Sequence, residues 1–150
     1  MRQPKKWRQG VNPDPVFELK AAVIGRLKAD ASVDAFVFGR VYDRPADGTK
    51  PSPYISMGPW DATTDGAECI DGMEINMQID CWSWGSGEAY GSAEVSKIAG
   101  AVRAALHEAE FELTTNALAT ISHRITRYQR ESDGATNRAI ISVTAFVELP

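Results

Sequence analysis

The chain has few of the residues that build metal centres or disulfide frameworks. Its two cysteines are Cys69 and Cys81, and its two histidines, His107 and His123, have no CxxC or HExxH companion. We therefore expect no zinc site, no other metal and no cofactor. Two cysteines without a secretory signal favour a reduced, cytosolic origin, and a Cys69–Cys81 bridge stays open as an alternative.

The chain also lacks a long apolar run and an excess of basic residues. Since no run of about eighteen apolar residues occurs, we expect no membrane span. A net charge of −4 argues against a protein whose main task is gripping nucleic acid. Residues 1–13 are basic, but no apolar segment follows them, so they do not read as a secretory signal. We interpret them as an arm that is either flexible or ordered on a partner through Trp7.

What is present suits one globular domain. A 150-residue chain with 43% hydrophobic residues can bury a core without metal or disulfide support, so we expect a single domain over residues 14–150. The most regular stretch is MEINMQIDCWSW at 73–84, in which apolar and polar residues alternate. Successive side chains of a strand point to opposite faces, so this stretch predicts a long strand with one face on the core. Its polar face meets either solvent or a neighbouring subunit.

Two helices are expected. The first begins at Asp14-Pro15, a good N-cap followed by a proline suited to the first helical position, and ends near residue 30. The second covers residues 88–107 after a Gly-Ser-Gly turn. Gly91 and Gly100 weaken this second helix, and we interpret them as allowing close approach to the sheet.

The remaining segments predict strands at 36–42, 53–58, 118–130 and 136–148, with 111–113 as a short strand or linker. Two connections rich in Pro, Gly and Asp, 43–52 and 59–72, separate the early strands. Ser132-Asp133-Gly134 is a turn signal that makes the last two strands a hairpin. Segregated helices and strands predict an α+β fold, a mostly antiparallel sheet of about four to six strands with two helices packed on one face.

No catalytic constellation emerges from the sequence. There is no GxSxG elbow, and neither cysteine has a histidine nearby in sequence. The alternation puts His123 on one strand face with Ile121 and Ile125, which favours a structural histidine. His107 sits where a helix should end, and a cation is favoured there by the helix dipole. We therefore expect a protein that is not an enzyme.

Basic residues gather near the predicted hairpin turn, where Arg138 lies across from Arg124, Arg127 and Arg130. Strand alternation places Arg124 and Arg130 on one face and Arg127 on the other. The cluster is either a solvated hairpin end or a contact with an acidic partner subunit, and nucleic acid is a third possibility.

Several stretches spread over residues 16–148 form a recognisable combination: LKAAVIGRLKAD at 19–30, GRVYDRPADGTKPSPYISMG at 39–58, Asp80-Cys81-Trp82-Ser83, Gly87-Glu88-Ala89, Arg127-Tyr128-Gln129-Arg130 and Asp133-Gly134. Together they resemble the tail terminator (tail completion, head-to-tail joining) family of long-tailed phages and gene transfer agents. Members are structural proteins of the virion. The resemblance implies a ring, typically a hexamer, that caps the tail tube and then offers the docking surface for the filled head.

The implied partners are other copies of the chain, the tail tube protein and the head-tail connector or stopper, with DNA passing through the lumen without specific binding. Loops 43–52 and 59–72 would contact the tube or connector or line the lumen. Trp60 is a candidate interface anchor, or else a local cap over the core. The full set of candidate interface or lumen residues is Arg44, Asp47, Lys50, Trp60, Asp61, Asp65, Glu68, Asp71, Glu74, Asp80, Trp82, Arg127 and Arg130.

Two alternatives accompany this hypothesis. The chain is either another neck or tail component, such as a head completion, stopper or tube-like protein, or a small bacterial ligand-binding or enzyme domain whose resemblance is accidental. A strict monomer that binds a metabolite would favour the second.

Overall fold

The computed structural model describes residues 14–45, 48, 50–68 and 70–150. The first helix, α1 (Pro15–Ala29), forms where the sequence predicts it. The Asp14 side chain accepts a hydrogen bond of 3.0 Å from Val16 N, which satisfies one of the free N–H groups at the helix start. Leu19, Val23 and Leu27 recur at four-residue spacing and are fully buried, so α1 is held by one apolar stripe.

A second helix and the turn that follows it replace most of the strand that was predicted at 36–42. Asp30 ends α1 and also caps α2 (Ala31–Val37), because its Oδ1 accepts a hydrogen bond of 2.9 Å from Val33 N. Only Val41–Tyr42 remains as strand β1. The strand prediction was wrong because burial of Val33 and Val37, one helical turn apart, outweighed the β propensity of this aromatic and branched segment.

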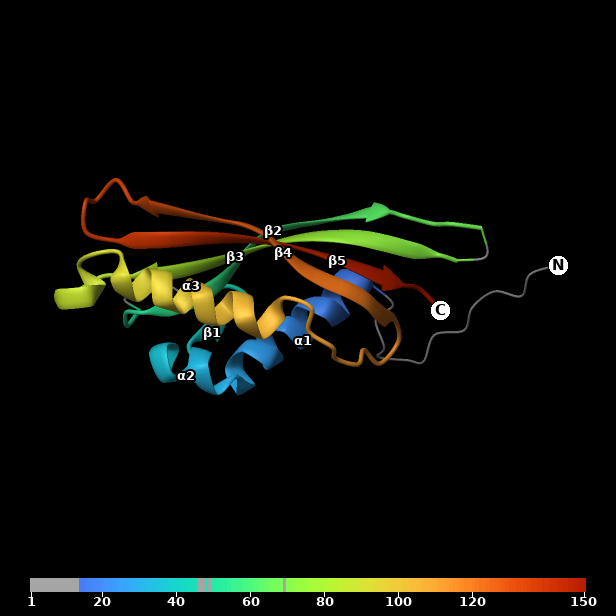
Figure 1. Ribbon diagram of the computed structural model, residues 1–150, viewed down its shortest axis with the longest axis horizontal. Helices are drawn as coiled ribbons and strands as arrows, with labels where there is room; N and C mark the ends of the chain where they lie inside the picture. The colour runs from blue at the N-terminus through green and yellow to red at the C-terminus, as the bar shows by residue number, and fades with distance from the viewer. Residues whose placement is uncertain (1–13, 46–47, 49, 69) are drawn as a thin grey trace.

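Five strands form one sheet in the order β1-β2-β3-β5-β4. Besides β1 they are β2 (Tyr54–Thr64), β3 (Gly72–Ser83), β4 (Ala117–Arg130) and β5 (Asn137–Glu148). The β1–β2 pair is parallel and the other pairs are antiparallel. The three helices α1, α2 and α3 lie on one side of this long, twisted sheet (Figure 1). The predicted α+β class is confirmed, and the described residues contain three α-helices where two were expected.

Strand β2 is longer than predicted, because it continues through Pro59 to Thr64. The pairing with β3 shifts between Met57 and Trp60, so Pro59 falls at an irregularity where its missing N–H removes no ladder bond. The interpretation of residues 59–72 as one long loop was therefore wrong. The outer part of β2 and the start of β3 form an arm that extends beyond the helices at one end of the molecule (Figure 1).

The helix predicted at 88–107 begins later, as α3 (Ala93–Leu106), after a short 3-10 turn η1 (Gly87–Ala89). Val95, Ile98, Val102 and Leu106 form its buried stripe. Gly100 is exposed, and nothing lies within 4 Å of the position that a Cβ would take there or at Gly91. The interpretation that these two glycines allow close approach to the sheet was therefore wrong.

The predicted alternation of the long strand is confirmed in β3. Ile75, Met77, Ile79 and Cys81 are all buried in the core between the sheet and the helices. Burial raises the pKa of the Cys81 thiol far above its usual range, so this side chain acts as a small apolar residue. Residues 111–113 connect α3 to β4 without forming a strand.

Candidate assembly surface

The sheet face that lies away from the helices, called the outer face below, carries the polar side chains of β3. They are Glu74, Asn76, Gln78, Asp80 and Trp82, and each is partly or fully buried. The described helices all lie on the opposite side of the sheet (Figure 1). The outer face is therefore an ordered polar surface in which side chains of neighbouring strands cover one another.

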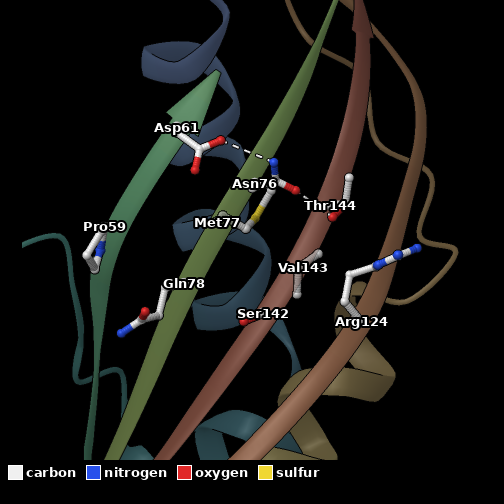
Figure 2. A pocket seen from close by; sticks show the side chains of 9 residues that line it. All are labelled: Pro59, Asp61, Asn76, Met77, Gln78, Arg124, Ser142, Val143 and Thr144. Atoms are coloured by element: carbon white, nitrogen blue, oxygen red, sulfur yellow. Dashed lines mark hydrogen bonds between the residues drawn. The ribbon is translucent and has the colours of Figure 1, made fainter. Parts of the chain in front are cut away.

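At the middle of the outer face a hydrogen-bond ladder crosses three strands. Asn76 Nδ2 donates to Asp61 Oδ1 at 3.1 Å, and Thr144 Oγ1 donates to Asn76 Oδ1 at 2.8 Å. These side chains line a shallow groove of about 390 Å³ together with Gln78 and Arg124, and Figure 2 shows how they lie. Because Asn76 is fixed on both sides, the ladder holds β2, β3 and β5 in one register and presents a rigid polar floor.

Asp80 is the most deeply buried charged residue of the outer face, at 3% exposure. Its carboxylate accepts a bond of 3.3 Å from Arg138 Nε, with Arg138 Nη2 3.2 Å from the second oxygen. Gln78 Nε2 also donates to Asp80, at 3.1 Å. The absence of a side chain at Gly58 makes room, since a Cβ there would lie 2.9 Å from Gln78 and 3.0 Å from Asp80. Asp80 is thus satisfied within its own chain.

Trp82 completes the same cluster. Its Nε1 donates to Ser56 Oγ at 2.9 Å, and the Arg138 guanidinium lies 4.6 Å from the ring centroid. Tyr54 stacks on Trp82 with ring centroids 6.1 Å apart. Burial first, and then the Asp80 charge, raise the pKa of Tyr54, so its hydroxyl stays protonated at neutral pH. The cluster joins the ends of β2, β3 and β5 through contacts that no single strand could make.

The arginines of the β4–β5 hairpin are distributed differently from the strand-alternation prediction. A register shift between His123 and Ile125 reverses the parity of β4 from that point on. Arg124 therefore lines the outer-face groove (Figure 2), and Arg127, paired with Ile140, also lies on the outer face. Arg130, paired with Asn137, lies on the helix side. The prediction that Arg124 and Arg130 share a face was wrong, as was the grouping of Ile125 with His123.

Trp60 lies on the core side of β2, opposite Met77, and packs against the core. The Lys20 ammonium is 5.1 Å from the centroid of its ring. Of the two interpretations of Trp60, this position fits a side chain that covers the core of its own subunit. Trp60 Nε1 is buried and has no hydrogen-bond partner among the described residues.

The other candidate residues occupy two separate places. Asp61, Asp65, Glu68 and Asp71 are all exposed on the arm or its tip. Arg44 is exposed in the β1–β2 connection, where Lys50 Nζ donates to Gly48 O at 2.8 Å. Asp47, Cys69 and the basic segment 1–13 lie outside the described residues.

The two histidines are joined by a hydrogen bond at the end of α3. His107 is the C-cap of α3, and its Nδ1 accepts a hydrogen bond of 3.0 Å from His123 N. His123 Nε2 is 2.7 Å from Thr126 Oγ1. Burial first, then the nearby Arg103 and His107, lower the pKa of His123. Among the described residues, no group of three or more His, Cys, Asp or Glu could hold a metal ion.

Sequence reasoning missed two exposed aromatic residues. Tyr90 is 63% exposed before α3, and Tyr128 is 52% exposed on the helix side of β4. Arg130 brings them into one neighbourhood, because its guanidinium lies 5.9 Å from the Tyr90 ring. Tyr90 is distant in sequence from the other two residues, so no sequence pattern could have placed it beside them. The two-residue spacing of Tyr128 and Arg130 does indicate that these two side chains share one face of their strand. Within the described chain, no helix is long and apolar enough to cross a membrane.

Most of the chain matches a known protein family and a chain of a solved structure. The family model described as tail completion protein gp17 matches residues 21–148. A chain in a solved structure, the virion of a native gene transfer agent particle, superposes with a TM-score of 0.79 at 28% sequence identity. The match covers 89% of this chain and 96% of that one. No curated protein gave a significant match.

Proposed function

Because the chain belongs to the tail completion protein gp17 family and is a structural protein of the virion tail, we propose that it caps the tail tube as a ring. In this proposal the ring is a hexamer, and its two sides contact the tail tube protein and the head-tail connector. The family match over residues 21–148, together with the likeness to a chain of an assembled particle, carries the proposal.

The ordered outer face supports a role in assembly. The Asp61–Asn76–Thr144 ladder and the Asp80–Arg138 pair fix polar side chains before any partner arrives. Preorganised side chains lose little conformational entropy on binding, so such a face can serve as a subunit contact or as a smooth channel wall. A ring needs two different surfaces per subunit that fit each other, and the chain offers distinct surfaces at the two ends of its sheet.

The exposed acids of the arm suit a lumen wall. Asp61, Asp65, Glu68 and Asp71 would present negative charge to DNA, which would then pass without sticking. The variant D61N/D65N/E68Q/D71N removes this charge while residue 61 keeps an oxygen for Asn76. Slower or incomplete DNA ejection is expected, and unchanged ejection and particle yield would refute the lumen role.

Deletion of the gene, followed by electron microscopy of the particles, tests the proposed function itself. We expect tails of uncontrolled length, or tails and heads that remain unjoined. Tails of normal length with a defect elsewhere would point to another neck or tail component. Particles of normal form and number would reject a role in tail completion.

A charge reversal tests whether the outer face meets a subunit. Glu74 is half-buried on this face and has no ion-pair partner among the described residues. We expect E74K to fold normally and to lower particle yield, because it places a cation where the interface has accommodated an anion. If E74K fully complements the deletion, this part of the outer face contacts solvent and not a neighbouring subunit.

A further inference from the structure

Helix α1 carries a second apolar flank besides the stripe that is buried in the core. Phe17, Ala21 and Ile24 recur at spacings of four and three residues, so they share one side of the helix, and it is not the side that meets the core. Together with Val16 they line an open groove of about 370 Å³, called the α1 groove below. Phe17 is 62% exposed. A helix that is apolar on a second side offers a surface that another segment can cover.

The chain itself supplies a segment at the edge of the α1 groove. Asp14 lines the groove and is also the residue to which residues 1–13, called the N-terminal segment below, are joined. Trp7 precedes Asp14 by seven positions, and an extended chain of that length reaches about 23 Å. The groove from Asp14 to Ile24 follows about 15 Å of helix. Trp7 is therefore within reach of every part of the groove, and Gly10 permits the turn that directs the segment back along α1.

The composition of the N-terminal segment matches the α1 groove in two respects. Trp7 is its one aromatic residue, and aromatic rings such as those of Trp7 and Phe17 attract each other in offset-stacked or edge-to-face arrangements. The segment also contains four cations and no acid.

The charged residues that line the α1 groove are mostly acidic. Two of the three are Asp14 and Asp43, and the third, Lys20, has its Nζ 3.4 Å from Asp43 Oδ1. The Asp43 side chain is still 64% exposed, so its carboxylate has room for a second cation. The groove therefore suits a segment that combines an aromatic ring with positive charge.

We infer that the N-terminal segment folds back over the α1 groove of its own chain. Because the segment is joined directly to the groove, its effective concentration there is in the millimolar range, which favours it over a partner that arrives from solution. The Trp7 ring covers Phe17 and Ile24, and the cations beside Trp7 lie toward Asp43. Since α1 lies on the helix side of the sheet, the docked segment keeps its positive charges away from the outer face (Figure 1). The contact uses no residue of the acidic arm and does not depend on the proposed ring.

Trypsin cleavage of the full-length protein measures the docking. The enzyme cuts after lysine and arginine and acts on the open population of a segment, so a docked segment is cut slowly. Mass spectrometry follows the cut after Arg8. F17S leaves the cleaved sequence intact and is expected to raise this rate at least tenfold over the wild type. The matched control is Y90S, which replaces an aromatic side chain of nearly equal exposure, 63%, outside the α1 groove, and which should leave the rate unchanged.

Two further comparisons identify the contact. W7A should raise the rate as F17S does, with synthetic peptides of residues 1–13, with and without W7A, correcting for the changed sequence. The double variant W7A/F17S should be cut no faster than either single variant, because both remove the same contact. D43K should also raise the rate, whereas E110K, which reverses an exposed charge elsewhere, should not.

Two results would overturn the inference. If F17S and the wild type are cut at the same rate, the N-terminal segment does not lie on the α1 groove. If protection appears only at protein concentrations where light scattering detects oligomers, the segment that covers the groove belongs to a neighbouring copy and not to the same chain. Protection that is independent of concentration and is lost in F17S, W7A and D43K supports the inference.

Discussion

Arg138 holds Asp80 through two contacts, Nε to Oδ1 at 3.3 Å and Nη2 to Oδ2 at 3.2 Å, on the sheet face that lies away from the described helices. The Asp80 side chain is only 4% exposed and that of Arg138 22%. Gln78 and Trp82 complete the enclosure. The pair therefore has the character of a buried ion pair, although it lies on the outer surface of the sheet.

Removing the Asp80 charge should destabilise the monomer. D80N leaves the Arg138 guanidinium with only the more distant carboxylate of Glu131, 3.9 Å away. Loss of one partner of a buried pair costs about 3 kcal/mol. Urea unfolding should show this loss. E74Q, on the same face, serves as the control and should change the free energy of unfolding by less than about 0.5 kcal/mol. An unfolding free energy for D80N equal to that of the wild type would mean that the pair contributes nothing to stability.

Replacing Gly100 by alanine should stabilise the protein. The residue is exposed in the interior of α3, and outside the adjacent backbone of its own helix nothing lies within 4 Å of the new Cβ. Alanine restricts the unfolded chain and favours the helix, which adds about 0.5–1 kcal/mol. G58A makes the opposite comparison, because its Cβ would meet Gln78 at 2.9 Å and displace it. Thermal unfolding should place G100A above the wild type and G58A below it.

Stability should fall as the pH drops below about 6.5, and His123 is one cause. Its pKa is lowered in the folded protein, so the unfolded chain takes up a proton first and unfolding becomes easier. H123Q removes this contribution and should show a shallower loss of stability between pH 7 and pH 5. Asp133, whose pKa is lowered by its bonds to Thr136 and Ala135, acts separately below about pH 4. Parallel pH profiles for H123Q and the wild type would contradict the assignment.

Glu18 links α1 to the start of β4 across 97 residues of sequence. Both of its carboxylate oxygens lie 3.0 Å from Thr115 N, and one also accepts from Asn116 N at 3.1 Å. Hydrogen bonds to a charged group contribute about 1.5–3 kcal/mol, so E18A should lower the free energy of unfolding by about 2 kcal/mol. E112A, an exposed glutamate in the neighbouring connection, is the matched control. Equal urea midpoints for the two variants would show that the link is unimportant.

Local patterns were sufficient wherever one face of an element met the core. The Asp14-Pro15 cap and the stripe of Leu19, Val23 and Leu27 set α1, and the period-two pattern of β3 set its buried face. The Ser132-Asp133-Gly134 turn set the β4–β5 hairpin. In each case the signal and the structure that satisfies it lie within about fifteen residues. The same stretches carried the resemblance to the family.

Short sequence patterns gave a wrong prediction where packing or strand pairing with residues far away in sequence determined the structure of a segment. The segment around Phe36 favours a strand by composition, but packing of Val33 and Val37 made it helical. Strand β2 passed through Pro59 because an irregular pairing with β3 tolerated it. The bulge after His123 moved Arg127 to the outer face, since one extra residue inverts every later side chain of a strand.

The sequence by itself thus determined the α+β class, the core faces of α1 and β3, and the separation of an acidic segment at 61–71 from a basic hairpin, because composition and short periodicities specify these. Only the tertiary structure decided that Asp80 is satisfied by Arg138, that Trp60 covers the core, and that Arg130 lies beside the Tyr90 ring. These relations join residues of different strands and helices. They depend on register and twist, which no single segment encodes.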